Sequence, residues 1–150
     1  MLKNIDSMIS PDLLGVLAAM GHGDEIAVVD ANFPAANLAR RLVRMDGANA
    51  SRALRAVLSL LPLDDYVDSP MTIMEVDGTP DSIPEPVREF QQIADSAENK
   101  QVVFNKINRF EFYDRARTAF AVLATAETRL YGCVLIKKGV IRPARDGSGE

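Results

Sequence analysis

The only histidine of the chain, His22, stands between two glycines in the segment Met20–Glu25. An imidazole titrates near neutral pH, so it can give and take a proton as a general acid or base. Flanking glycines let the backbone bend and leave the ring unshielded. The alternative is an ordinary surface histidine after a helix, which spacing alone favours. A carboxylate could orient the ring, but the sequence does not decide between Asp24 and Asp30.

Two further segments carry groups that could hold a ligand rich in hydroxyls. Asp30 follows the apolar run Ile26–Val29, and the carboxyl end of a strand is where ligands bind in open α/β sheets. Arg109 offers a planar fork of donors. Its aromatic neighbours are Phe110, Phe112 and Tyr113. Sugars need both donors and apolar faces. A loop-opening aspartate is an equally simple interpretation of Asp30, and the spacing favours core positions for Phe110 and Phe112 over a role in a site.

The segment Arg129–Gly139 places Tyr131 just before an apolar run that we read as a strand. Gly132 permits close approach of a ligand or of another backbone. Cys133 is the only cysteine, and a lone cysteine is more often a small buried residue than a nucleophile. It cannot form an intrachain disulfide, which fits a reducing cytoplasm. We predict neither a metal site nor a cofactor.

The elements that must position these residues alternate between helices and strands. Apolar periodicity predicts helices at 11–20, 50–61, 85–98 and 110–117, and strands at 26–29, 71–76, 101–107, 119–124 and 132–137. Residues 38–45 fit either type. Gly21 is expected to end the first helix with a positive φ. We therefore expect one α/β domain over residues 1–150, with a mostly parallel sheet flanked by helices and a flexible tail from about 142 to 150.

Composition narrows the possible function classes. Apolar residues make up 47% and charged residues 25%, with a net charge of −4, as in soluble globular proteins. The absence of a basic run disfavours nucleic acid and anionic membranes as partners. No apolar run could span a bilayer, and the start is not a signal peptide. Phosphate loops and dinucleotide motifs are absent as well.

Five segments in this order resemble the L-fucose mutarotase family, the relatives of D-ribose pyranase. They are MGHGDEI, DANFPA, the turn Asp46-Gly47, INRFEFY and YGCVLIKKGV, and they cover nearly all of residues 1–140. Each is weak alone, but the combination is specific. The resemblance implies a ribose pyranase/fucose mutarotase-like fold and a cytoplasmic isomerase that interconverts the anomers of L-fucose without a cofactor. The INRFEFY segment and the Asn-Phe-Pro that follows Asp30 look like the fucose branch.

The resemblance also implies roles for individual residues. His22 would be the proton donor. The sugar-binding residues would be Asp30, Arg109, Tyr131, Gly132 and Cys133. It further implies a homo-oligomer, with a decamer as the expected form and sites at subunit contacts.

The distance along the chain between two of these residues sets a geometric condition. From His22 to Asp30 is eight residues, which span up to ~26 Å when extended. We therefore predict that different subunits supply them and that a monomer is inactive. Three alternatives stay open: a pyranase acting on ribose, a non-catalytic sugar-binding module and a plain oligomeric scaffold.

Overall fold

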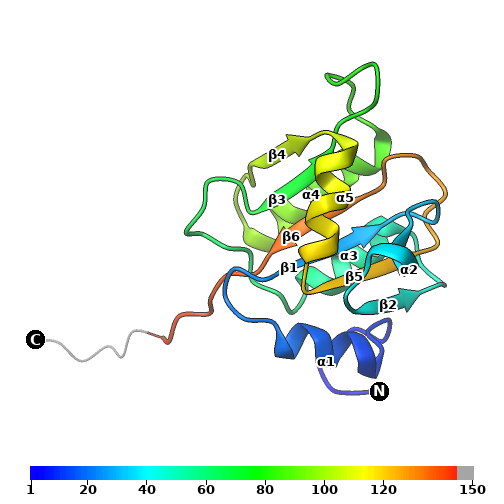
Figure 1. Cartoon of the computed structure of the whole chain (residues 1–150). Helices are drawn as coiled ribbons and strands as arrows, with labels where there is room; N and C mark the ends of the chain where they lie inside the picture. Colours follow the sequence, from blue (N-terminus) through cyan, green and yellow to red (C-terminus); the bar gives the residue numbers. More distant parts are fainter. Residues whose placement is uncertain (145–150) are drawn as a thin grey trace, which may run out of the picture.

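The computed structural model describes residues 1–144 and arranges them around one six-stranded sheet (Figure 1). The strands are β1 (Glu25–Val29), β2 (Leu42–Met45), β3 (Met71–Met74), β4 (Phe104–Ile107), β5 (Ala121–Thr125) and β6 (Val134–Lys137). Their order is β2-β5-β1-β6-β3-β4. All pairs are parallel except those that β6 makes with β1 and β3. The prediction of an α/β fold with a mostly parallel sheet is confirmed.

Helices cover both faces of this sheet. In the described part of the chain they are α1 (Pro11–Ala19), α2 (Ala35–Leu38), α3 (Ala50–Leu58), α4 (Glu85–Glu98) and α5 (Arg109–Thr118). One face carries α3 and α4, and α1 joins the same core. The other face carries α2 and α5 (Figure 1). None of these helices is long and apolar enough to cross a membrane.

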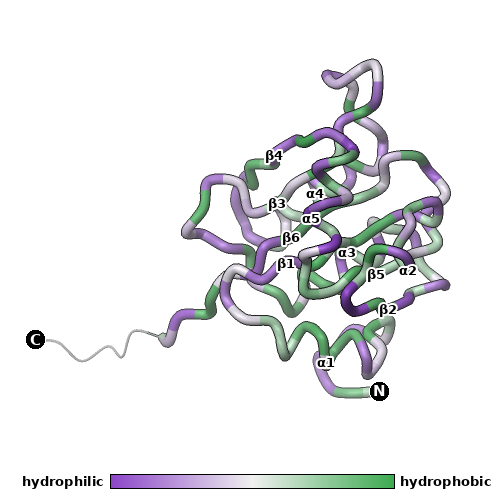
Figure 2. Tube along the Cα trace, viewed as in Figure 1, coloured by the Kyte–Doolittle hydropathy of each residue, from purple (hydrophilic) through white to green (hydrophobic). Residues whose placement is uncertain are grey.

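The central strand β1 is buried on both sides because its side chains alternate between the two cores. Ile26 and Val28 pack into the core under α3 and α4, whereas Ala27 and Val29 pack under α2 and α5. Figure 2 shows hydrophobic residues along β1 and hydrophilic ones in many of the outer loops. The continuous apolar run in the sequence thus reflects a strand covered by helices on both faces.

The first helix begins as predicted but ends differently. Ser10 caps it, since its side chain accepts the Leu13 N–H at 3.1 Å. The helix ends at Ala19 and Met20 is already extended. The positive φ belongs to Gly23, at 84°, and not to Gly21, so the predicted role of Gly21 is wrong. Its N–H instead donates to Asp24 Oδ2 at 2.7 Å, which tightens the turn that presents His22.

Other element boundaries differ from the predictions by a few residues. The ambiguous region 38–45 contains the end of α2 and the whole of β2. The strand predicted at 132–137 begins only at Val134, because Tyr131 has a left-handed backbone with φ 59°. Most of the predicted tail, residues 145–150, lies outside the described residues. Within the described part of it, Arg142 pairs with Asp65 at 2.6 Å.

An ion pair fastens the N-terminal segment to α3. Arg52 Nη1 and Nη2 each lie 2.7 Å from an oxygen of Asp6. The hydrogen bonds from Arg52, with that from the Met8 N–H, lower the pKa of Asp6 from 3.8 to about 2. Because the pKa is lower in the folded state, this contribution is complete above about pH 4 and is lost as the pH falls toward 2.

We expect Asp6→Asn to lower the free energy of unfolding at pH 7 by about 1 kcal/mol, since screening reduces the value of a partly exposed pair. The difference between parent and variant should shrink between pH 4 and pH 2. Urea titrations at several pH values measure it. A difference that stays constant down to pH 2 would show that the carboxylate charge is not the cause.

Candidate functional site

A pocket of about 290 Å³ lies at the edge of the sheet where the parallel strands end, close to the lower end of the usual range for ligand sites, about 300 Å³. Asp30 reaches it from the end of β1 and Met74 from the end of β3. Cys133 comes from the start of β6, which runs antiparallel between them. The other lining residues are Asn32, Phe33, Asp77, Arg109, Tyr113, Leu130 and Tyr131. Four of the five predicted sugar-binding residues thus meet in one pocket.

Asp30 and Cys133 are joined across β1 and β6. Asp30 is only 7% exposed, and its Oδ1 accepts the Asn32 N–H at 3.0 Å. Its Oδ2 lies 3.4 Å from Cys133 Sγ, and its own N–H donates to the same sulfur at 3.4 Å. A carboxylate has about four acceptor positions, so Asp30 can still accept from a ligand hydroxyl.

The chemistry of Cys133 follows from its burial. The side chain is 1% exposed. Burial first, and the Asp30 carboxylate second, raise the pKa of the thiol well above its usual range. Because the nucleophilic form of cysteine is the thiolate, Cys133 acts here as a donor that holds Asp30 in place.

Arg109 brings a guanidinium group to the pocket. It is the first residue of α5, which Asn108 caps. The guanidinium lies over the ring of Phe110 at 4.8 Å and at 6.0 Å from the centre of Tyr113. Its Nε is buried and, within the described residues, makes no hydrogen bond, although Asp77 Oδ2 is 3.1 Å away. Nε is ion-paired with Asp77, and the side chain as a whole is 40% exposed and lines the pocket, so the other N–H groups of the guanidinium can donate to a ligand oxygen.

The aromatic residues after Arg109 divide between surface and core. Phe112 is fully buried, as a core residue should be, whereas Phe110 is 68% exposed. The interpretation of both as core residues is therefore wrong for Phe110. Its ring contacts the guanidinium of Arg109, and Arg109 lines the pocket. The exposed ring of Phe110 therefore packs against a residue of the site.

Asp77 and Asn32 line the pocket although the sequence did not single them out. Asp77 was read only as part of the turn Asp77-Gly78, which the structure contains. Its N–H donates to the Tyr131 hydroxyl oxygen at 3.2 Å, which ties the turn after β3 to the loop before β6. Asp77 follows a strand of the parallel set, as Asp30 does, so the same position rule would have found it.

Gly132 does not line the pocket. A Cβ placed there would lie 2.7 Å from Glu127 Cγ and 3.3 Å from the Arg129 carbonyl oxygen. The expected close approach at Gly132 therefore exists, and the approaching group is the side chain of Glu127.

His22 lies at the opposite edge of the sheet. The following residue, Gly23, donates to the carbonyl of Lys138 at 2.8 Å, just beyond the end of β6. Strand β1 separates His22 from Asp30 (Figure 1), and its five residues are about 13 Å long. One chain therefore does not bring the predicted proton donor to the predicted sugar-binding residues.

The partner of the imidazole is Asp64. His22 Nε2 lies 3.0 Å from Asp64 Oδ1, and Asp64 is only 4% exposed. Asp24 instead accepts from Gly21 and Asp30 belongs to the pocket, so neither of the two considered residues orients the ring. Because a carboxylate can only accept, Nε2 carries a hydrogen and Nδ1 is the nitrogen left for a ligand.

The sequence carried no signal for this pair. The two residues are 42 positions apart. The β-bridge between Leu63 and Lys138 brings the loop of Asp64 beside the turn of His22. Within residues 1–144, no group of three His, Cys, Asp or Glu residues could hold a metal ion.

These features define a one-sheet α/β protein with a pocket of charged and aromatic side chains where its parallel strands end. A model of the RbsD / FucU transport protein family matches residues 3–141. The fucose mutarotase of Homo sapiens is 45% identical in an alignment of 146 positions that covers 93% of this chain and 94% of that protein. The chain belongs to the RbsD / FucU transport protein family, and the resemblance found in its motifs is confirmed.

Solved structures agree with this assignment. The fucose mutarotase of Streptococcus pneumoniae, in complex with L-fucose, superposes with a TM-score of 0.87 at 43% identity and covers 94% of this chain and 100% of its own. RbsD of Bacillus subtilis, complexed with D-ribose, gives a TM-score of 0.67 at 18% identity over 95% of this chain and 100% of its own. The second similarity concerns the fold alone.

Proposed function

We propose that this chain interconverts the α and β anomers of L-fucose by acid/base-assisted opening and closing of the sugar ring. The observation that carries the proposal is the pocket that is lined by both the buried carboxylate of Asp30 and the guanidinium of Arg109. Fucose mutarotases that are 40–45% identical over most of the chain are among its relatives. An acceptor, a donor and aromatic surface together suit a small sugar.

The reaction needs only proton transfers. Opening adds a proton to the ring oxygen, removes one from the anomeric hydroxyl and breaks the bond between the anomeric carbon and the ring oxygen. The aldehyde then rotates, and closing on its other face reverses both transfers. One acid/base group can serve each direction in turn, so no net proton, electron or cofactor is consumed.

His22 is the group we assign to this transfer, through Nδ1. Asp64 holds the ring through Nε2 at 3.0 Å, which fixes the orientation of the imidazole and leaves Nδ1 for the sugar. Asp30 and Arg109 bind hydroxyls, and Tyr131 lines the wall of the pocket. Asp64 is thus a positioning residue that acts through His22.

His22 reaches the sugar from a neighbouring subunit in this proposal. Each edge of the sheet carries exposed apolar side chains, which mark interaction surfaces. Tyr66 and Val67 lie on the loop of Asp64, Leu130 lines the pocket, and Phe110 contacts Arg109. Joining the two different edges head to tail gives a contact that repeats around a closed ring. We expect a homo-oligomer, with a decamer as the expected form.

Location and partners follow as further expectations. We expect the enzyme in the cytoplasm, where free monosaccharides are metabolised and a lone buried thiol such as Cys133 stays reduced. We expect no nucleic-acid partner, because the net charge is −4 and the chain has no basic run.

The function is tested by NMR exchange spectroscopy on L-fucose, D-ribose, galactose and rhamnose. We expect the parent to speed the exchange between the anomers of fucose most. His22→Ala should fold and assemble but lose roughly 10²–10⁴ of the catalysed rate, the usual contribution of a general acid/base. Exchange of ribose and not of fucose would favour a pyranase. Sugar binding without any exchange would favour a non-catalytic module.

The pairing of Asp64 with His22 predicts a second variant. Asp64→Asn keeps the shape but removes the charge behind the ring, so we expect the exchange rate to fall about tenfold or more with fucose affinity unchanged. Asp65→Asn is the matched control, because Asp65 pairs with Arg142 and not with His22. If both variants exchange fucose at the parental rate, Asp64 has no role in the proton transfer.

Mixing a variant that lacks the proton donor with one that binds the sugar weakly tests whether subunits share the site, at a fucose concentration where each alone is nearly inactive. His22→Ala and Arg109→Ala subunits, co-expressed with different tags, should regain exchange when they assemble together. In a random equal mixture roughly a quarter of the sites would combine an intact His22 with an intact pocket. Subunits that carry both substitutions, mixed with either single variant, are the control. If the mixture stays as inactive as its components, both residues serve the same chain's site.

A further inference from the structure

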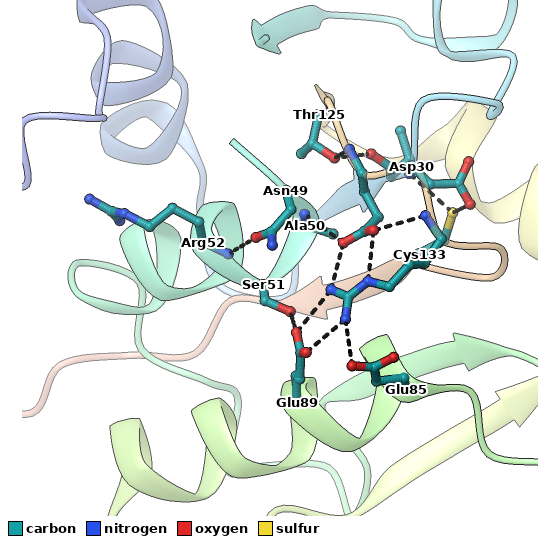
Figure 3. A network of polar contacts seen from close by, with 12 residues as sticks. Asp30, Asn49, Ala50, Ser51, Arg52, Glu85, Glu89, Thr125 and Cys133 are labelled. Carbon is teal, nitrogen blue, oxygen red and sulfur yellow. Dashed lines mark hydrogen bonds and ion pairs between the residues drawn. The ribbon is translucent and has the colours of Figure 1, made fainter. Parts of the chain in front are cut away.

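The loop that precedes β6 rests on a buried ionic network that the reaction itself does not use. Figure 3 shows polar contacts that run from Asp30 and Cys133 to Ser51 on α3 and to Glu85 and Glu89 on α4. At its centre is Glu127, which is only 1% exposed. A carboxylate so deeply buried must be hydrogen-bonded on both oxygens to be tolerated.

Glu127 meets that requirement with partners from separate parts of the chain. Its Oε1 accepts from Arg129 N and Nε, each at 2.9 Å. Its Oε2 accepts from Arg129 Nη2 at 2.9 Å and from the backbone N–H of Ala50, at the start of α3, at 3.3 Å. The carboxylate therefore joins Glu127 to Arg129 within one turn and anchors that turn to the start of α3.

Arg129 carries the connection on to α4. Its Nη1 lies 2.7 Å from Glu89 Oε1 and 3.4 Å from Glu85 Oε1, and its Nη2 lies 3.0 Å from Glu89 Oε2. Glu89 also accepts from the Ser51 hydroxyl. The hydrogen bonds from Arg129, followed by that from Ser51, lower the pKa of Glu89 to about 2. The Glu89 carboxylate therefore keeps its charge at neutral pH.

The same turn touches the sugar pocket on both sides. The carbonyl of Glu127 accepts the N–H of Ala31 at 2.8 Å, which sets the backbone directly after Asp30. The Glu127 side chain fills the space that a Cβ on Gly132 would need. Tyr131, which precedes Gly132, has a φ of 59°. Non-glycine residues adopt this conformation only when their surroundings impose it.

We propose that Glu127 is a positioning residue for sugar binding: its buried carboxylate, with Arg129, holds Tyr131–Cys133 and the backbone after Asp30 in the geometry that the sugar requires. The proposal rests on the proposed function of the pocket. Glu127 itself does not line the pocket, so it acts through the residues it positions and not on the sugar.

The test compares Glu127→Gln with the parent in two measurements. The amide keeps the volume but replaces one acceptor oxygen by a donor group that faces other donors. We expect KM for fucose, from NMR exchange rates, to rise about tenfold while kcat changes less than about threefold. Hydrogen exchange followed by mass spectrometry should quicken in residues 128–133 and 31–33, and remain parental in α1 and α5.

Asp95→Asn is the matched control, because Asp95 also accepts a backbone N–H, from Val102 at 2.8 Å, at a distance from the pocket residues. It should leave KM for fucose and the exchange of residues 128–133 unchanged. If Glu127→Gln does not fold, Arg129→Lys is used, since lysine keeps the charge but cannot bridge two carboxylates as a fork. We expect the same two effects from it.

The outcomes separate this proposal from the function it rests on. If the parent neither binds nor exchanges fucose, the proposed function fails, and the hydrogen-exchange measurement still decides whether Glu127 holds the loop. If the parent is active but the folded variant keeps both the parental KM and the parental protection of residues 128–133, the positioning role of Glu127 is overturned. Equal effects of Glu127→Gln and Asp95→Asn on KM would also overturn it.

Discussion

The antiparallel insertion of β6 between β1 and β3 is the constraint on which the rest of the site depends. Because β6 runs against its neighbours, its first residue comes to lie beside the end of β1, and Cys133 meets Asp30 there. Its last residues lie beside the start of β1, where Lys138 contacts Gly23. One short strand thereby shapes both edges of the sheet. The pocket forms at one edge and the histidine turn forms at the other.

This arrangement gives each edge an incomplete set of groups. The pocket has an acceptor in Asp30 and a cation in Arg109, but no imidazole. The other edge has His22, whose side chain is 43% exposed and is backed by a buried carboxylate, and His22 is not among the residues that line the pocket of Asp30. A folded strand cannot shorten, so motion within one chain does not bridge the two edges. Association of chains supplies the simplest route by which the groups can meet.

The sequence predicted local structure well because local structure depends on neighbouring residues. Ser10 and Pro11 predicted a helix start, and the run after Glu25 predicted a buried strand. Asp30 was found because polar groups at strand ends follow a position rule, whereas Arg109, Tyr131 and Cys133 were assigned to sugar binding through the family resemblance. Asp64 was missed because its link to His22 depends on which loops the sheet brings together, and no spacing records that. The positive φ was assigned to Gly21 because this glycine directly follows the predicted helix, and a glycine often ends a helix in that way. The sequence does not show that Gly23 adopts it instead.

Glu127 was missed for a related reason, and its position shows what the sequence motif around Tyr131 requires. A buried ion pair adds little to stability, because desolvation offsets the attraction between the charges. Hydrophobic residues could fill the same volume between α3 and α4. They would not, however, bind the backbone N–H groups of Ala50 and Arg129, which a buried turn must satisfy. The charged network therefore satisfies the backbone of an irregular loop, which apolar side chains cannot do. In that loop Tyr131 has a left-handed backbone shortly before β6, its hydroxyl accepts the Asp77 N–H, and Cys133 contacts Asp30.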